Sequence, residues 1–271
     1  LCFVILICSL NVLRATHIIG GEMYYECLGY GKNGTDTTSR RYLITIKLYR
    51  DCYSGGAQFD NPLGFSIFRE QGQTWVNTKT GPNPEYRVNL TQPVERIDPP
   101  TYPCLLLPPN VCGEVGTYTL EVELPIINSR YLVVWQRCCR NPTITNIVDP
   151  EATGATYNIE IHPEAQLTCN SSPRFINFPP TVLCVNTPFK FDHSAFDKEG
   201  DLIVYEFCEP LEGGSRMNVT PTPESKPPYT PVSYRVPYTA LFPLGGNPLV
   251  TINTLNGIIS GKPDVIGQFV V

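Results

Sequence analysis

The sequence predicts an all-β protein built from two β-sandwich domains, and three observations lead to that prediction. The 271 residues include 21 glycines and 27 prolines, which are hard to fit into long helices and suit short strands joined by turns. Runs rich in Tyr, Thr, Val, Ile and Phe fill the intervals between them, as is typical of strands. No segment carries an apolar stripe with the 3.6-residue period of a helix.

The first fifteen residues have the features of an export signal. Residues 1–10 are almost wholly apolar, and Ala15 precedes a polar, tyrosine-rich stretch. A run this short cannot span a bilayer, so we interpret residues 1–15 as an incomplete secretory signal that is cleaved near Ala15. Two alternatives stay open: the segment is a buried first strand or helix, or Cys8 belongs to a lipoprotein signal.

The charge and hydropathy of the chain argue against nucleic-acid binding and against a membrane-spanning helix. The formal net charge is −5 and no basic stripe occurs, so nothing supports nucleic-acid binding. After the signal, no stretch is long and apolar enough to form a transmembrane helix. We therefore expect a secreted chain whose mature part does not cross a membrane.

The first predicted domain spans residues 16–168. Apolar and polar positions alternate in several short runs, separated by turns such as that at residues 54–56. Strands at this spacing favour a sandwich. The predicted strands are 41–50, 64–68, 85–90, 117–124, 131–137 and 156–161.

The second predicted domain spans residues 169–271 and begins at the motif Cys169-Asn-Ser-Ser-Pro173. A loose proline-rich stretch at 221–231 interrupts its strands, and an apolar run at 267–271 resembles a strand cut short. We therefore expect a smaller sandwich that is incomplete at its C-terminus. Its predicted strands are 181–185, 188–191, 202–207, 232–236, 249–252 and 267–271.

Cysteine usage predicts disulfide bonds. Two of the 11 cysteines lie in the presumed signal, and the nine others form neither a CxxC pair nor a Cys/His cluster of the kind that zinc prefers. In an exported chain such cysteines typically form disulfide bonds. Since nine is odd, one is free or its partner lies outside this sequence. The nine are Cys27, Cys52, Cys104, Cys112, Cys138, Cys139, Cys169, Cys184 and Cys208.

Connectivity does not follow from sequence alone, and local pairing is our first hypothesis. Cys104–Cys112 and Cys169–Cys184 would each close a proline-rich loop. The neighbours Cys138 and Cys139 suit two separate bridges, because adjacent residues of a strand point to opposite faces. A bond between these two neighbours is the rarer alternative.

One acidic turn is the sharpest candidate site. In Asp197-Lys-Glu-Gly-Asp201, acidic side chains alternate around a glycine, a pattern that can direct several carboxylates at one hard cation. The sequence thus predicts calcium bound by Asp197, Glu199 and Asp201, with Asp192 upstream. The alternative is a solvated acidic hairpin in which Asp and Gly serve the turn.

Enzyme patterns are missing from the sequence. It holds no GxSxG or HExxH motif, and His17, His162 and His193 fall in separate segments. His193 adjoins Ser194, but we interpret it as a strand-end residue and not as half of a catalytic dyad. Among the aromatic residues, Trp135 is expected in the core, whereas Trp75 is the more plausible exposed ring for binding a sugar. We therefore expect no catalysis.

Several motifs together resemble one family. The chain is similar to the N-terminal region of large Bacteroidetes surface proteins that carry PKD-like or other immunoglobulin-like repeats, and often a gliding-motility-associated C-terminal domain read by the type nine secretion system. That resemblance implies a location on the bacterial cell surface, outside the outer membrane. The motifs are Thr16-His-Ile-Ile-Gly-Gly-Glu-Met23, Leu48-Tyr-Arg-Asp-Cys-Tyr53, Pro108-Pro-Asn-Val-Cys112, Gln136-Arg-Cys-Cys-Arg-Asn141, Gly154-Ala-Thr-Tyr157, Cys169-Asn-Ser-Ser-Pro173 and Phe191-Asp-His-Ser-Ala195.

The second domain also resembles cadherin-like and immunoglobulin-like modules. Their acidic turn followed by a strand corresponds to residues 197–205, and a later hairpin and closing strand correspond to residues 252–263 and 267–271. The resemblance implies immunoglobulin-like sandwiches and calcium at the turn. Glu199 stands where the modules have Asp.

These features predict a non-catalytic surface protein for adhesion or structural display. Its expected partners are other cell-surface proteins or extracellular glycans. Two alternatives remain: a carbohydrate-binding module of an exported polysaccharide-degrading protein, or an accessory region of a secreted hydrolase.

Overall fold

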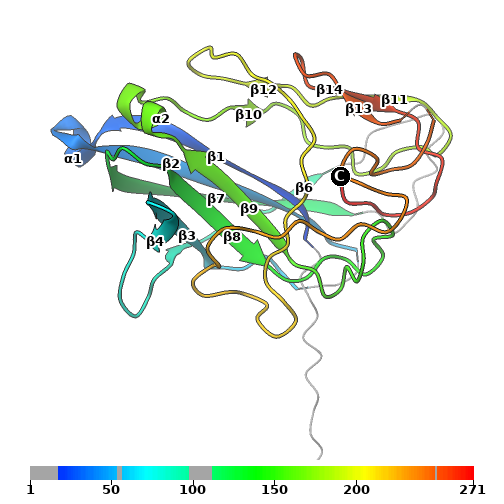
Figure 1. Ribbon diagram of the computed structural model, residues 1–271, viewed down its shortest axis with the longest axis horizontal. Helices are drawn as coiled ribbons and strands as arrows, with labels where there is room; N and C mark the ends of the chain where they lie inside the picture. The colour runs from blue at the N-terminus through cyan, green and yellow to red at the C-terminus, as the bar shows by residue number, and fades with distance from the viewer. Residues whose placement is uncertain (1–17, 54–56, 98–111, 248) are drawn as a thin grey trace, which may run out of the picture.

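The computed structural model describes residues 18–53, 57–97, 112–247 and 249–271. In these residues the chain consists mainly of strands and loops around two antiparallel sheets that face each other (Figure 1). This confirms the all-β sandwich that the sequence predicts. The predicted signal at residues 1–15, together with His17 and Cys104, lies outside the described residues.

The first sheet has the strand order β1-β2-β7-β6, and all its pairs are antiparallel. A short turn, α1 (Gly31–Gly34), joins the first two strands, with Lys32 and Asn33 at positive φ. The long ladder between the two central strands makes this sheet the most regular part of the molecule. Its strands are β1 (Ile18–Tyr30), β2 (Asp36–Asp51), β6 (Glu95–Ile97) and β7 (Gly113–Pro125).

The second sheet has the order β4-β3-β8-β9, and β5 also pairs with β3. A single short helix, α2 (Pro163–Thr168), follows the last strand, and the buried Arg40 donates to its Gln166 and Leu167 carbonyls. The strands are β3 (Leu63–Gln71), β4 (Thr74–Asn77), β5 (Tyr86–Val88), β8 (Tyr131–Arg137) and β9 (Ala155–Ile161).

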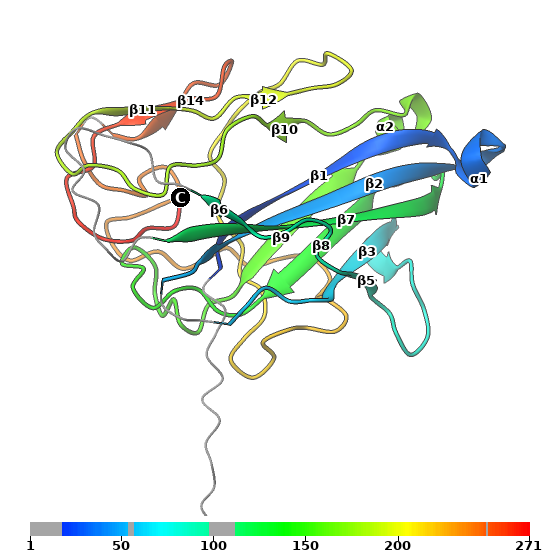
Figure 2. The same cartoon turned by 180° about the vertical axis from the view of Figure 1, so that it is seen from behind.

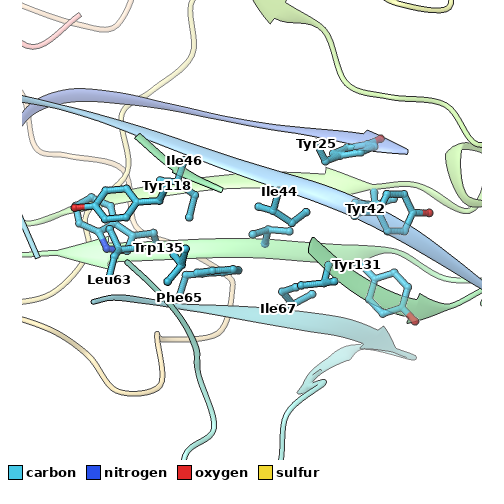
Figure 3. Packing of buried hydrophobic residues seen from close by; sticks show 14 of the residues in the cluster. Tyr25, Tyr42, Ile44, Ile46, Leu63, Phe65, Ile67, Tyr118, Tyr131 and Trp135 are labelled. Atoms are coloured by element: carbon cyan, nitrogen blue, oxygen red, sulfur yellow. The ribbon is translucent and has the colours of Figure 1, made fainter. Parts of the chain in front are cut away.

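The core fills the space between the two sheets. Alternate residues of β2, β3 and β8 point inward, which is the period of two that a strand with one buried face requires (Figure 3). Burying one such Ile, Leu or Phe side chain contributes about 1.5–3 kcal/mol. Trp135 is 1% exposed, which confirms its predicted core position. The inward set includes Tyr42, Ile44, Ile46, Leu48, Leu63, Phe65, Ile67, Tyr131, Val133 and Trp135.

Strand β1 is the main element of the first half of the chain, which ends at residue 168, that the sequence did not predict. It contains Gly20, Gly21 and Gly29, and its pairing with β2 is irregular at two places. Its exposed and buried positions alternate poorly because both faces are partly covered. The Tyr25 and Cys27 side chains enter the core, and the Arg174 guanidinium of the second half packs on the ring of Tyr24.

The second half of the chain, residues 169–271, has much shorter strands. Two small sheets form, with orders β10-β12 and β11-β14-β13 (Figure 1). The predicted strands at 181–185, 202–207, 232–236 and 267–271 are wrong as regular strands. Their backbone groups instead make isolated bonds, such as Arg235 N–H to the Asn146 carbonyl and Thr145 N–H to the Gln268 carbonyl. The strands are β10 (Arg174–Phe175), β11 (Phe189–Asp192), β12 (Ala195–Phe196), β13 (Thr251–Ile252) and β14 (Ile258–Gly261).

A proline-rich strap, residues 219–231, covers the outer face of the second sheet beside β8 (Figure 1). Its Tyr229 packs with Trp75 against a small cluster of Phe68, Leu132 and Val134. The Val219 carbonyl accepts a hydrogen bond from Cys138 N–H at 2.9 Å. The strap thus gives the second sheet a covered outer face.

A second contact between the halves centres on the loop after β8. Ile144 and Ile147 pack with Val232 and Val270. The fully buried Asn146 donates to the Pro243 and Val270 carbonyls and accepts from Val270 N–H. The division into domains 16–168 and 169–271 therefore stays a prediction, with a shared small core across it.

The structure corrects the predicted disulfides. Cys52 pairs with Cys112, and Cys27 with Cys169, so neither local pair forms. The first bridge continues the ladder: Asp51 lies opposite Gly113, so the next residues of the two antiparallel strands also face each other.

The adjacent pair Cys138 and Cys139 forms one bond, which corrects the two bridges predicted there. Strand β8 ends at Arg137, so the rule of opposite faces no longer applies to the next two residues. Cys184 is also disulfide-bonded, and Cys208 is an exposed free thiol. This cysteine usage is typical of an oxidising compartment.

Candidate functional site at the junction of the two halves

The acidic turn forms a compact loop after β12. The Asp197 carboxylate accepts a hydrogen bond from Asp201 N–H at 2.8 Å, and Gly200 between them has φ of +85°. Only glycine adopts that angle at little cost, which explains why it occupies the bend. Asp197 and Gly200 therefore form the bend that the sequence predicts.

The same turn rests on the segment that leaves the first half. Ser171 Oγ donates to Glu199 Oε1 at 3.0 Å, and the Asn170 amide donates to Asp201 Oδ2. With the bond from Asp201 N–H to Asp197, all three predicted metal ligands thus already have protein donors. Their contacts tie residues 197–201 to the residues that follow α2.

Glu26 of β1 links the turn to the first sheet. Its carboxylate binds Lys198 Nζ at 2.6 Å and Arg174 Nη2 at 2.7 Å. The hydrogen bond from Lys198, followed by that from Arg174, holds the pKa of Glu26 below its ordinary value. The three side chains form an ion cluster, which we call the Glu26 cluster.

Residues 171 and 172 extend the edge of β1. Ser172 N–H donates to the Tyr25 carbonyl at 3.0 Å, while Tyr25 N–H donates to Ser172 Oγ at 2.8 Å. Cys27 N–H donates to Ser171 Oγ at 3.2 Å. Both views of the fold place β10 and β12 beyond this edge (Figure 1, Figure 2). The outer edge of β1 is consequently paired at these positions.

A disulfide fixes the same junction covalently. Cys27 lies near the end of β1 and Cys169 directly follows α2, with Cα atoms 5.3 Å apart. The bond joins positions 142 apart in the sequence. Covalent, backbone and ionic contacts therefore converge within a few residues of one another.

The pKa of the Tyr25 hydroxyl reflects both burial and the negative charges of this junction. Burial raises the pKa of its hydroxyl to about 12, and the carboxylates of Glu199 and Asp197 add to the increase. The phenol therefore stays protonated at physiological pH. Its ring packs edge-on against Tyr42, so it joins the acidic turn to the core.

The predicted calcium site is not supported by this arrangement. Among the described residues, no group of three or more His, Cys, Asp or Glu side chains could hold a metal ion. Glu199 and Asp201 face Ser171 and Asn170, whereas a calcium ion requires several oxygens directed at one point. Calcium binding at Asp197, Glu199 and Asp201 stays a prediction.

The structure also places two other residues that the sequence singled out. His193 directly follows β11 and stacks on Phe175, with ring centroids 4.0 Å apart, which confirms it as a strand-end residue. Trp75 is partly buried in the cluster under the strap, and the Arg130 guanidinium lies 5.4 Å from its ring. Trp75 is therefore only half-buried and not the exposed ring that the sequence predicts, while sugar binding stays a prediction.

The residues that complete the junction escaped sequence reasoning. Ser171 and Ser172 lie in a motif that marks only the family resemblance and the predicted domain boundary, and Glu26 and Arg174 lie in no motif or predicted strand. Only the repeated small polar residues after Cys169 could have signalled a strand edge, since serine hydroxyls can replace backbone partners. The Glu26 cluster depends on contacts between positions that are more than a hundred residues apart, and no local pattern reveals these.

Comparisons with protein families, with curated proteins and with solved structures find no match to this chain. No helix in the described part of the chain is long and apolar enough to cross a membrane.

Proposed function

We propose that this chain is a non-catalytic module of an exported surface protein, and that it serves structural display or adhesion by carrying mechanical load. Its partners in this proposal are other cell-surface proteins or extracellular glycans. The observation that supports the proposal is the Cys27–Cys169 bond at the junction. The resemblance to Bacteroidetes surface proteins agrees with it.

The bond creates a short path for force. Tension applied at the two ends of the chain enters near β1, crosses from Cys27 to Cys169 and leaves through the second half. Residues 28–168, which include most of the sandwich, form a closed loop outside that path. A module built in this way keeps its core folded while its ends are pulled.

Single-molecule force extension of oxidised residues 16–271, held at both ends, tests the proposal. The 28–168 loop corresponds to roughly 500 Å of extended chain. We expect this length to be missing from the oxidised unfolding trace. Part of it should return in the Cys27→Ser/Cys169→Ser variant, in which the Cys52–Cys112 bond still closes its own loop, and all of it should return when the wild-type chain is reduced.

A matched control is the Cys52→Ser/Cys112→Ser variant, whose bond lies inside the loop. This control should leave the loop shielded. If the oxidised wild-type chain releases the full length, or if the junction yields at forces no higher than in the Cys27→Ser/Cys169→Ser variant, the load-bearing proposal fails.

A further inference from the structure

The strap carries a buried carboxyl group that the junction does not use. Glu224 is 3% exposed and accepts a hydrogen bond from Ser66 Oγ of β3 at 2.5 Å. Two more bonds hold the strap at its flanks: Ser225 N–H donates to Gln136 Oε1 at 2.7 Å, and Cys138 N–H donates to the Val219 carbonyl. Glu224 therefore lies beneath the strap, against the sheet.

A second buried carboxylate occupies the same face. Glu85 is also 3% exposed and packs on Gly64, where any Cβ atom would overlap its carboxylate. Gly64 and Ser66 are two residues apart on β3 and so point to the same face of the sheet. The two acids thus come from separate segments and share one water-poor surface.

Among the described residues, the cations of this surface have partners other than the Glu224 carboxylate, and Arg137 of β8 binds Asp60 and Thr220 of the strap. Arg87 binds Glu85 Oε1 at 2.5 Å, and Lys79 Nζ donates to the Glu85 carbonyl. Lys226 of the strap is exposed. Tyr229 is neutral, and both burial and the Glu224 carboxylate raise the pKa of its hydroxyl. An ionised Glu224 would therefore be a buried charge facing a like charge, which is unfavourable.

We propose that the strap is a pH-responsive cover, which stays docked on the second sheet while Glu224 holds its proton and is released when that proton is lost. Release exposes the apolar cluster of Phe68, Leu132 and Val134. The inference is independent of the load-bearing proposal, because the strap lies away from the Cys27–Cys169 junction.

The direction of the pH effect on docking follows from the different pKa values of Glu224 in the docked and undocked strap. Burial, helped by Glu85, raises the pKa of Glu224 from 4.5 to about 7, against the opposing hydrogen bond from Ser66. An undocked strap returns Glu224 to water and to its ordinary pKa. Docking is then strongest below pH 4.5, weakens as pH rises through 7 and levels off above it. Between pH 5 and pH 8 the docking equilibrium should weaken by roughly 70-fold.

Hydrogen exchange on the oxidised chain tests this proposal, with intrinsic exchange rates divided out. The amides of Ser225 and Cys138 report docking, and amides of β2 report global unfolding. We expect protection at both reporters to fall by roughly 70-fold from pH 5 to pH 8 while β2 stays protected.

The Glu224→Gln variant keeps an acceptor for Ser66 and cannot ionise, so its strap protection should not change with pH. The exposed Glu206→Gln variant should behave as wild type. A flat wild-type profile, or an equal fall in Glu224→Gln, overturns the proposal. A titration of the wild-type Glu224 carboxyl carbon needs no variant: a midpoint near 7 supports the proposal, and one at the ordinary value contradicts it.

Discussion

The two halves of this chain reach a fixed structure by different means. The first half has strands of up to 16 residues and a core between two sheets. The second half has strands of two to four residues, and it is held through the junction, the strap and the loop around Asn146. Alternation of apolar and polar residues therefore predicts structure where strands pair with each other, and it fails where a segment packs on a surface that other strands have already formed.

Exposure shows the same contrast. In the first half, Leu63, Phe65 and Ile67 are 0% exposed. In the second half, Leu202 is 86% and Val236 is 96% exposed, although both lie in runs that the sequence predicts as strands. Apolar residues of the second half therefore contribute less to its stability than their number implies.

The largest expected effect is in the core. Phe65→Ala should lower the free energy of unfolding by about 3–5 kcal/mol, because it removes a fully buried ring and leaves a cavity. The matched variant Leu202→Ala should change it by less than about 0.5 kcal/mol. Urea denaturation of the oxidised chain measures both values. Comparable losses in the two variants would remove the contrast between the halves.

The next effect concerns the junction. Cys27→Ser combined with Cys169→Ser should cost about 2–4 kcal/mol, since it frees a long loop in the unfolded chain. The amides of Ser172 and Tyr25 should lose more hydrogen-exchange protection than those of β8. If protection falls uniformly, the bond stabilises the whole chain and not the junction.

A smaller effect is expected at the shared core. Asn146→Ala should cost about 1–3 kcal/mol, because it strips buried backbone groups of Val270 and Pro243 of their hydrogen-bond partner. The exposed Asn218→Ala is the control and should be neutral. Thermal unfolding of the two variants provides the comparison, and equal transition temperatures would show that the loop does not fasten the second half.

The smallest effect belongs to the Glu26 cluster. Because the folded-state pKa of Glu26 is depressed, its ion pairs stabilise the chain above the ordinary value of 4.5 and are lost as pH falls through the folded-state pKa. Lys198→Met should cost less than about 1 kcal/mol near neutral pH. An NMR titration should show the Glu26 midpoint rising in this variant, and no change in Lys190→Met. An unmoved midpoint would mean that Lys198 does not govern Glu26.

Sequence reasoning succeeded where local chemistry decides the structure. The strand at 131–137 has the predicted bounds, and Trp135 is buried as expected, because period-two alternation directly reflects a half-buried strand. The bend at Gly200 was also predictable from its residue types. These features need only neighbouring residues.

The features that were missed depend on register and on distant contacts. The Cys52–Cys112 bond follows from the pairing of β2 with β7, which the sequence does not reveal. Nothing in the sequence distinguishes Glu224 from other loop residues, because its burial depends on how the strap packs over β3. The acidic turn was found as a motif, but its donors Asn170 and Ser171 come from another segment. Sequence patterns thus identify turns and half-buried strands better than they identify the distant segments that pack against them.

We infer that the second half depends on the first for its structure. An amide NMR spectrum of isolated residues 169–271, with Cys169→Ser, tests this dependence. Without β1, the sheet face under the strap and the loop around Asn146, this segment lacks the surfaces to which it is fastened. We predict narrow amide dispersion and no hydrogen-exchange protection. A well-dispersed spectrum whose peaks coincide with those of the same residues in the full chain would contradict the claim and establish the second half as an independent domain.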